Sequence, residues 1–147
     1  MATEHSVEEA AIRQQLNTLV AAIQAKDLDG VKRIYGPGIV SFDVEPPLQR
    51  VGVDGKGQNW EHAFALFELP ITYEVRDLTI VVGDGVAFAH SLNRLSGTLQ
   101  NGNRSNGFWV RATLCLQKIA GSWLIVHDHA SVPLDFASGR ALLNLEP

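Results

Sequence analysis

Apolar residues recur at helical spacing in the first part of the chain. Ser6 followed by Glu9 is typical of a capping box at the start of a helix. The apolar positions that follow predict an amphipathic helix over about residues 6–26: Ile12, Leu16, Leu19, Val20 and Ile23. The apolar stripe of such a helix must be covered by a sheet or by another helix.

Two shorter helices are predicted next. Asp27 can cap a helix in LDGVKRIY, and the sequence Gly36-Pro37-Gly38 would end it because proline and glycine do not continue a helix. A strand, IVSFDV, follows. Trp60, Phe64 and Phe67 then share one face of a third helix, from about residue 54 to residue 68.

The pattern then changes to runs of β-branched and aromatic residues, which predict strands. There are four such runs: ITYEVRDLTIVV, VAFAHSLNRL, GFWVRATLCLQ and SWLIVHDHAS. Glycine-containing turns separate them, as in an antiparallel meander. Helices first and strands afterwards predict an α+β fold, in which about three N-terminal helices close a curved, antiparallel or mixed sheet.

The turn at Ala120-Gly121 predicts which residues of the last hairpin face each other. Counting outward from a two-residue turn places His127 opposite Leu114 and His129 opposite Ala112. This face is the more apolar one, so both histidines are expected to point toward the core. Asp128 falls on the opposite face, with Thr113. A slip of one residue in register would reverse this assignment.

Length and composition predict a single domain over residues 1–147, with a core of about 6–133 and a tail of 134–147. The formal charge of -4 without a basic cluster argues against nucleic-acid and anionic-membrane partners. Cys115 is the only cysteine, so no intrachain disulfide is possible. The acidic N-terminus does not have the pattern of a signal peptide, and no long apolar run predicts a membrane span. We expect a cytoplasmic protein.

The order of elements carries a resemblance to a known family. A helix, then AKDLDGVKRIYGPGIVSFD, a helix with tryptophan, and a meander ending in GSWLIVHDHASVP are similar to the SnoaL-like and ketosteroid-isomerase-like branch of the nuclear transport factor two-like superfamily. The resemblance covers about residues 6–133. It implies a cystatin-like cone of curved sheet with a pocket inside, and a homodimer through the outer face of the sheet.

The resemblance also implies where catalysis would take place. Asp43 matches the strand position at which ketosteroid isomerases carry their general base, whereas their hydrogen-bond donors fall near Leu19 and Leu114, which cannot donate. His90 and His127 match pocket-lining positions. An aspartate with two histidines resembles scytalone dehydratase, and together they could act as acid and base near neutral pH. The catalytic candidates are Asp43, His90 and His127.

The expected ligand is a small, mainly apolar, oxygenated molecule. Five further residues are candidates for binding it: Tyr35, Trp60, His129, Ser131 and Leu114. We predict a lyase or isomerase without a cofactor. Three alternatives stay open: the polar groups form a buried network without catalysis, the cone is a non-catalytic binding or assembly module, or the three histidines hold a metal. No metal ligand is assigned.

Overall fold

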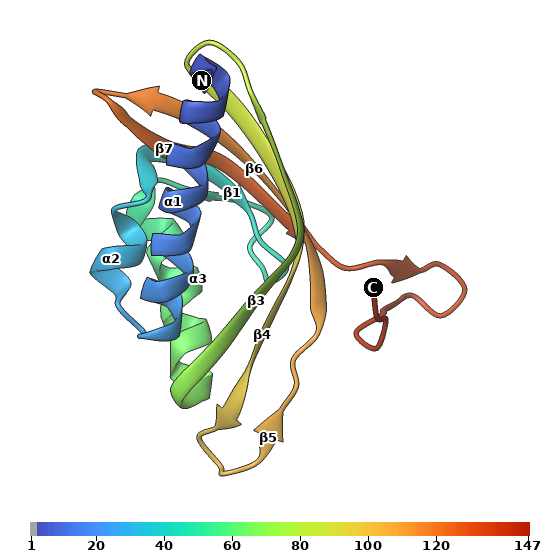
Figure 1. Ribbon diagram of the computed structural model, residues 1–147. Coiled ribbons are helices and arrows are strands. Elements are labelled where there is room, and N and C mark those ends of the chain that lie inside the picture. Colours follow the sequence, from blue (N-terminus) through green and yellow to red (C-terminus); the bar gives the residue numbers. More distant parts are fainter. Residues whose placement is uncertain (1–2) are drawn as a thin grey trace.

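The computed structural model describes residues 3–147. Its three helices cover one face of a strongly curved sheet (Figure 1). The elements of the N-terminal half are α1 (Glu4–Gln24), α2 (Leu28–Lys32), β1 (Tyr35–Phe42), β2 (Arg50–Val51) and α3 (Val53–Leu66). The remaining elements are β3 (Phe67–Val82), β4 (Val86–Leu99), β5 (Arg104–Ser105), β6 (Trp109–Ile119), β7 (Ser122–Ser131), β8 (Leu134–Asp135) and β9 (Arg140–Ala141).

The main sheet has the order β2-β1-β7-β6-β4-β3, with β5 paired to β4. The pair β1–β7 is parallel and the other pairs are antiparallel, so the sheet is mixed. Strand β1 comes from the N-terminal half of the chain and joins the meander at its last strand, β7. This arrangement confirms the predicted α+β class with a curved mixed sheet closed by N-terminal helices.

The helices begin and end close to the predicted positions, with two differences. Helix α1 begins earlier than predicted, because Thr3 rather than Ser6 is the N-cap and accepts a hydrogen bond from the Ser6 amide. Strand β1 already includes Gly36-Pro37-Gly38, which the sequence predicts only as the end of the second helix. Asp27 caps α2 as predicted, through a 3.0 Å hydrogen bond from the Gly30 amide.

The core lies between α1 and the sheet face that the helices cover, which we call the inner face. The side chains in its centre are all apolar and nearly fully buried: Ile12, Ile23, Val31, Ile39, Ala89, Leu116 and Ile125. Near the ends of β1 and β7 this dry packing gives way to polar side chains. None of the helices in residues 3–147 combines the length and the apolar character that a membrane crossing requires.

Candidate active site

A cavity of about 470 Å³ lies between the helices and the inner face, and we call it the inner cavity. Its volume is within the range of pockets that enclose small molecules, about 300–1,000 Å³. Much of its wall is apolar: Leu16, Leu19, Val20, Trp60, Phe67, Leu78, Leu95, Phe108, Val110 and Leu114. Its polar wall is smaller: Tyr35, Asp43, Glu45, Lys56, Asn59, His62, Tyr73, Ser91, Asn93, Ser105, Asp128 and His129.

Three carboxylates and one ammonium group lie in this wall. The Glu45 carboxylate is held by Arg50, Asn59 and His62, whereas Asp43 and Asp128 share Lys56. Lys56 Nζ lies 2.6 Å from Asp43 Oδ1 and 3.1 Å from Asp128 Oδ2, so the lysine bridges both aspartates. The side chain of Lys56 is only 5% exposed. Buried charges are tolerated when they are paired and hydrogen-bonded, and this cluster satisfies that condition for the lysine.

Ser41 and Arg50 complete the charged cluster from β1 and β2. Ser41 Oγ lies 3.1 Å from Asp43 Oδ1 and donates a hydrogen bond to Asp128 Oδ1. Arg50 Nε is 3.7 Å from Asp43 Oδ2, and both of these buried atoms are without a hydrogen-bond partner among residues 3–147. Since one hydroxyl proton can serve only one carboxylate at a time, the two aspartates compete for Ser41.

Two tyrosine hydroxyls face the same cavity. Tyr35 Oη accepts a hydrogen bond from Trp60 Nε1 at 2.8 Å, and Tyr73 Oη accepts one from Asn93 Nδ2 at 2.9 Å. In the described part of the chain neither hydroxyl donates to a protein acceptor. Burial raises the pKa of Tyr73 to about 12, and burial together with the charge of Asp128 raises the pKa of Tyr35 well above its usual value. Both groups therefore remain O–H donors at neutral pH.

The local sequence explains why these groups converge. Ser41 is near the end of β1 and Asp43 directly follows the strand, so the two side chains, two residues apart, project on the same side. Ser41 is in register with Asp128 on β7. Lys56 lies four residues before Trp60 on α3, so one helix face carries both side chains toward the cavity. The Lys56 ammonium is 5.7 Å from the centre of the Tyr35 ring and 5.8 Å from that of Trp60.

The predicted orientation of His127 and His129 is wrong. The hairpin follows the expected count as far as Leu116 opposite Ile125, but the next pair is Cys115 opposite His127. Val126 is an extra residue, so the bulge exchanges the two faces of β7 beyond this point. Asp128 now pairs with Leu114 on the inner face, and both histidines lie on the opposite face, which we call the outer face.

The outer face also carries His90, which was the third histidine of the predicted site. His90 is exposed and is in register with Thr113, whose other neighbour is His129. His127 packs edge-on against Phe42 at 4.7 Å and contacts the Val40 carbonyl oxygen through Nδ1 at 2.6 Å. The three predicted catalytic residues are thus divided, with Asp43 at the inner cavity and the two histidines on the far side of the sheet.

The predicted ligand-binding residues are divided in the same way. Tyr35, Trp60 and Leu114 line the inner cavity. His129 contributes to that wall as well, although its ring lies 5.6 Å from the ring of Phe42 on the outer side. Ser131 is on the outer face, where it accepts a hydrogen bond from Arg111 Nε at 3.2 Å. Within residues 3–147, no three His, Cys, Asp or Glu side chains are grouped so that they could hold a metal ion.

Sequence reasoning missed Lys56, Tyr73, Asn93 and Asp128. Lys56 continues the series Trp60, Phe64 and Phe67 one helical turn toward the N-terminus. A lysine on an otherwise apolar helix face is a signal of a buried charge that needs a carboxylate partner. Asp128 carried no comparable signal, since its face depends on the bulge.

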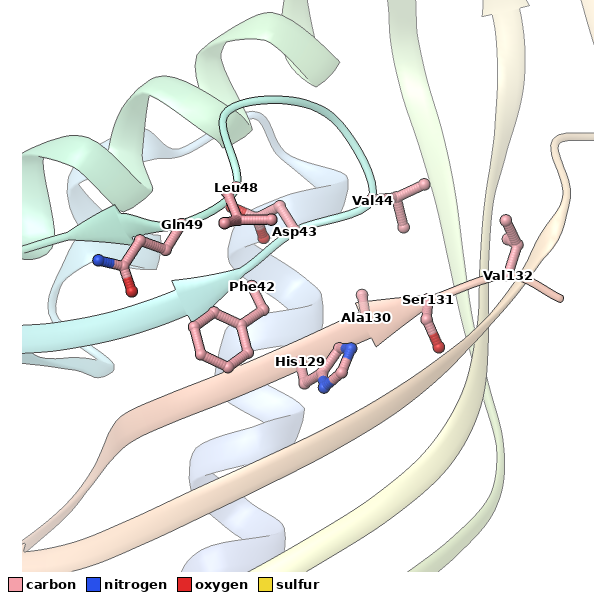
Figure 2. A pocket seen from close by; sticks show the side chains of 9 residues that line it. All are labelled: Phe42, Asp43, Val44, Leu48, Gln49, His129, Ala130, Ser131 and Val132. Atoms are coloured by element: carbon pink, nitrogen blue, oxygen red, sulfur yellow. The ribbon is translucent and has the colours of Figure 1, made fainter. Parts of the chain in front are cut away.

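A second depression lies on the outer side, at the ends of β1 and β7, and we call it the outer hollow (Figure 2). Its volume is about 490 Å³. The residues that line it come from the β1–β2 connection and from the end of β7: Phe42, Asp43, Val44, Leu48, Gln49, His129, Ala130, Ser131 and Val132. Asp43 lines both depressions, so the segment that carries it separates the inner cavity from the outer hollow.

Comparison with known proteins gives one family match. The model of the SnoaL-like domain matches residues 12–135. No protein with a curated description matches the chain. Among solved structures, an NTF2-like protein of unknown function from Pseudomonas putida KT2440 shares 30% sequence identity. That match covers 96% of this chain and 97% of the other, with a TM-score of 0.85.

Two more distant structures share the fold. A candidate dehydratase of the NTF2-like family from Streptomyces avermitilis is 14% identical over 89% of this chain and 99% of its own, with a TM-score of 0.76. A ketosteroid isomerase-like protein from Erwinia carotovora atroseptica SCRI1043 is 21% identical over 83% and 93%, with a TM-score of 0.68. At these identities the likeness concerns the fold and not the chemistry.

Proposed function

Because this chain belongs to the SnoaL-like domain family, we propose that its inner cavity binds a small, mainly apolar, oxygenated molecule and moves a proton on it without a cofactor. One observation supports this above all others: a carboxylate pair bridged by Lys56 lies in the same mostly apolar cavity as two tyrosine O–H groups. A proton acceptor opposite hydrogen-bond donors is what enolate-type chemistry requires.

Asp128 is the proton acceptor in this proposal. Its side chain is 12% exposed, against 6% for Asp43, and it lines the inner cavity. Both carboxylates are held by the cluster, Asp128 by Ser41 and Lys56 and Asp43 by Lys56. The difference between them is that Asp43 Oδ2 is buried beside Arg50, away from a ligand. Asp43 therefore has a positioning role, in which it holds Lys56 and Ser41 against Asp128. This assignment moves the base from the residue that the sequence predicted to its neighbour in the cluster.

Tyr35 and Tyr73 supply the donors that the sequence reasoning did not find at Leu19 and Leu114. Each hydroxyl already accepts a hydrogen bond from the protein, so its proton is free for an oxygen atom of the ligand. Their raised pKa values keep the protons in place as negative charge develops on that oxygen. The two groups would therefore stabilise an enolate or hold a carbonyl oxygen.

Two reaction classes fit this arrangement. In both, Asp128 takes a proton from a carbon beside a carbonyl group, and the electron pair of the C–H bond becomes part of an enolate. Return of the proton from Asp128 to another carbon gives an isomerase. In a dehydratase-type lyase the enolate expels a hydroxyl group, which takes up the proton held by Asp128 and leaves as water, so that a C=C bond forms. Structural neighbours named as a candidate dehydratase and as ketosteroid isomerase-like agree with both classes.

The proton transfer can be tested before the substrate is identified. The protein would be incubated in deuterated water with a panel of small cyclic and aromatic ketones, and deuterium uptake at the carbon beside the carbonyl would be followed by NMR. We expect Asp128→Asn to lower the rate by about 10²–10⁴-fold. Asp84→Asn is the matched control, since the Asp84 side chain is fully exposed in the β3–β4 turn. Equal rates for Asp128→Asn and the wild type would remove Asp128 from the mechanism.

A non-catalytic binding module is the second candidate, and one observation favours it. Lys56 is paired with both carboxylates, so the cluster is stabilised as it stands and could serve only to hold the cavity walls together. Thermal-shift measurements with the same panel distinguish the two. Ligands that stabilise the protein but exchange no deuterium in its presence would support the binding module.

The proposal also includes the expected partners and location. Exposed apolar side chains on the outer face, among them Phe88 and Val81, support a homodimer through this face. A single cysteine and the absence of a basic cluster from the sequence support a cytoplasmic protein without nucleic-acid partners. The dimer is testable by light scattering, and the location by fractionation of the native cells.

A further inference from the structure

The last segment of the chain, residues 132–147, is not part of the main sheet, and we call it the C-terminal arm. A 3.1 Å hydrogen bond from Trp109 Nε1 on β6 to Glu146 Oε2 holds its end against the sheet. The arm leaves the end of β7 and extends away from the side of the sheet opposite the helices (Figure 1). Its two short strands, β8 and β9, pair with each other and form a sheet of their own. The arm therefore projects from the same side of the molecule on which the outer hollow lies.

Internal hydrogen bonds give the arm a defined shape. Asp135 Oδ2 accepts from the Ser138 amide at 3.2 Å and from its hydroxyl at 2.7 Å, and these bonds lower the pKa of Asp135. The Gly139 amide donates to the Asp135 carbonyl at 2.8 Å, and the Leu142 amide donates to the Pro133 carbonyl at 2.9 Å. The arm is thus a hydrogen-bonded hairpin rather than an irregular tail.

The apolar side chains of this hairpin have little to pack against. Phe136 is 92% exposed, at the tip of the hairpin, and Leu134 is 53% exposed. Leu143 and Leu145 are about half exposed, at 49% and 47%. A two-stranded hairpin alone is at best marginally stable in water. A hairpin that has a defined conformation and exposes a phenylalanine is therefore expected to pack against another protein surface.

The outer hollow offers such a surface. Leu48 is 96% exposed at its rim and Val44 is 43% exposed, while the ring of Phe42 lies in its wall (Figure 2). The hollow has room for an aromatic ring, with about 490 Å³. Phe136 of the same chain does not occupy it, because that side chain is almost fully exposed. The hollow is therefore not filled by the Phe136 ring of its own chain, and the arm carries an exposed aromatic side chain.

We propose that the C-terminal arm of one copy lies across a second copy of this chain and inserts Phe136 into the outer hollow of that copy. A second copy is the occupant that the geometry favours, because the arm begins at Val132, which is itself part of the hollow's wall. A twofold axis close to this root places each arm over the other hollow, so both contacts form at once. An unrelated partner would satisfy only one of the two surfaces.

This exchange would also affect the inner cavity. Asp43 lies between the two depressions, so the partner's Phe136 would cover the outer side of the segment that carries Asp43. Each subunit would then complete the enclosure of the charged cluster in the other. The inference concerns assembly and does not depend on the proposed proton transfer, so either can fail without the other.

The first test is the effect of single substitutions on dimer dissociation, measured by analytical ultracentrifugation over a range of concentrations. We expect Phe136→Asp and Leu48→Asp each to raise the dissociation constant by about 30-fold or more, as for a buried anchor residue. Val7→Asp is the matched control, because Val7 is 57% exposed on α1, on the other side of the sheet. Circular dichroism would establish that the variants are folded.

The second test identifies the contact itself. Phe136→Cys and Leu48→Cys are made in separate proteins that also carry Cys115→Ala, which removes the only native cysteine. Mixing the two under mild oxidation should give a disulfide-linked heterodimer, which cannot form within one chain. A protein with both cysteines serves as the counterpart, because a disulfide within its monomer would mean that the arm folds back on its own chain.

The outcomes separate clearly. A mixed disulfide together with a weakened dimer for Phe136→Asp supports the arm exchange. The inference is overturned by a monomeric wild type, by a dimer that Phe136→Asp leaves intact, or by a disulfide found only within single chains.

Discussion

The inner and outer faces of the sheet differ in chemistry even where the residues on them are neighbours in the sequence. Ser41 and Asp128 project inward and belong to a buried cluster of charges, whereas Phe42 and His129, one residue further on each strand, project outward. Both pairs lie on the same two strands, β1 and β7. The difference shows that the chemistry of this site is set by register, since alternate residues enter a cavity or face solvent.

The two faces also differ in what their polar groups need. Asp128 and Lys56 are buried, so the charge of each is stabilised by its partners inside the protein and not by water. His90 and His129 are exposed and can be hydrated whether or not they contact another residue. The same kind of substitution should therefore have a large effect on the inner face and a small one on the outer face.

Removing the lysine is the strongest test of this difference. Lys56→Met would leave two buried carboxylates without the ammonium that bridges them, and we expect the free energy of unfolding to fall by about 3–5 kcal/mol. The measurement is urea denaturation at neutral pH. Lys32→Met is the control, because the 3.4 Å ion pair of Lys32 with exposed Asp54 is worth less than about 1 kcal/mol. Similar losses in both variants would contradict a special role for the inner cluster.

Two neighbouring residues on β7 provide a second, smaller contrast. Asp128→Ala removes charge-assisted hydrogen bonds from Lys56 and Ser41 and should lower the free energy of unfolding by about 2–3 kcal/mol. His129→Ala should change it by no more than about 0.5 kcal/mol, as expected for an exposed position. If denaturation experiments reversed the order of the two effects, the assignment of Asp128 to the inner face and His129 to the outer face would be wrong.

The sequence predicted the fold because the fold follows from repeated patterns. Helical spacing and strand runs recur over many residues, so one irregular position does not change the overall assignment, and the Ala120-Gly121 turn correctly paired Ile119 with Ser122 and Leu116 with Ile125. The site instead depends on single positions. Val126 has the pattern of any β-branched strand residue, yet as a bulge it decides which of Asp128 and His129 projects toward the inner face.

The convergence of Lys56 with the aspartates was beyond sequence reasoning for another reason. Asp43, Lys56 and Asp128 come from the end of β1, α3 and β7, and their contacts depend on how a helix packs on a curved sheet. Curvature is a property of the whole sheet and has no local sequence signal in this chain. Tyr35 was predicted as a ligand-binding residue from its chemistry, and it lies in the wall of the inner cavity. That it binds a ligand stays a prediction.

The tyrosines permit a pH test of the inner face, because Tyr35 and Tyr73 are the only tyrosines in the chain. Their raised pKa values mean that above about pH 10 the unfolded chain loses protons that the folded protein keeps. Stability therefore falls as the pH rises. For Tyr73, with a pKa of about 12 in the folded protein, the loss is about 1.4 kcal/mol by about pH 11.

Tyrosinate absorbance measures this directly. Folded protein should show almost none at about pH 10.5, whereas protein unfolded in urea should titrate near the usual value of about 10. Tyr73→Phe should remove its part of the alkaline loss of stability relative to the wild type. Normal titration of both tyrosines in the folded protein would mean that the inner cavity is open to water.

The smallest expected effect belongs to His90, and it is informative because the sequence made this residue a catalytic candidate. His90 is exposed between Thr79 and Thr113 on the outer face, and it lines neither the inner cavity nor the outer hollow. His90→Gln should therefore change the free energy of unfolding by less than about 0.5 kcal/mol and leave deuterium exchange unaltered. A fall in the exchange rate without a loss of stability would require His90 to reach a ligand from the outer face. The division of chemistry between the two faces would then be wrong, since a proton donor would act from the side that we propose for subunit contact.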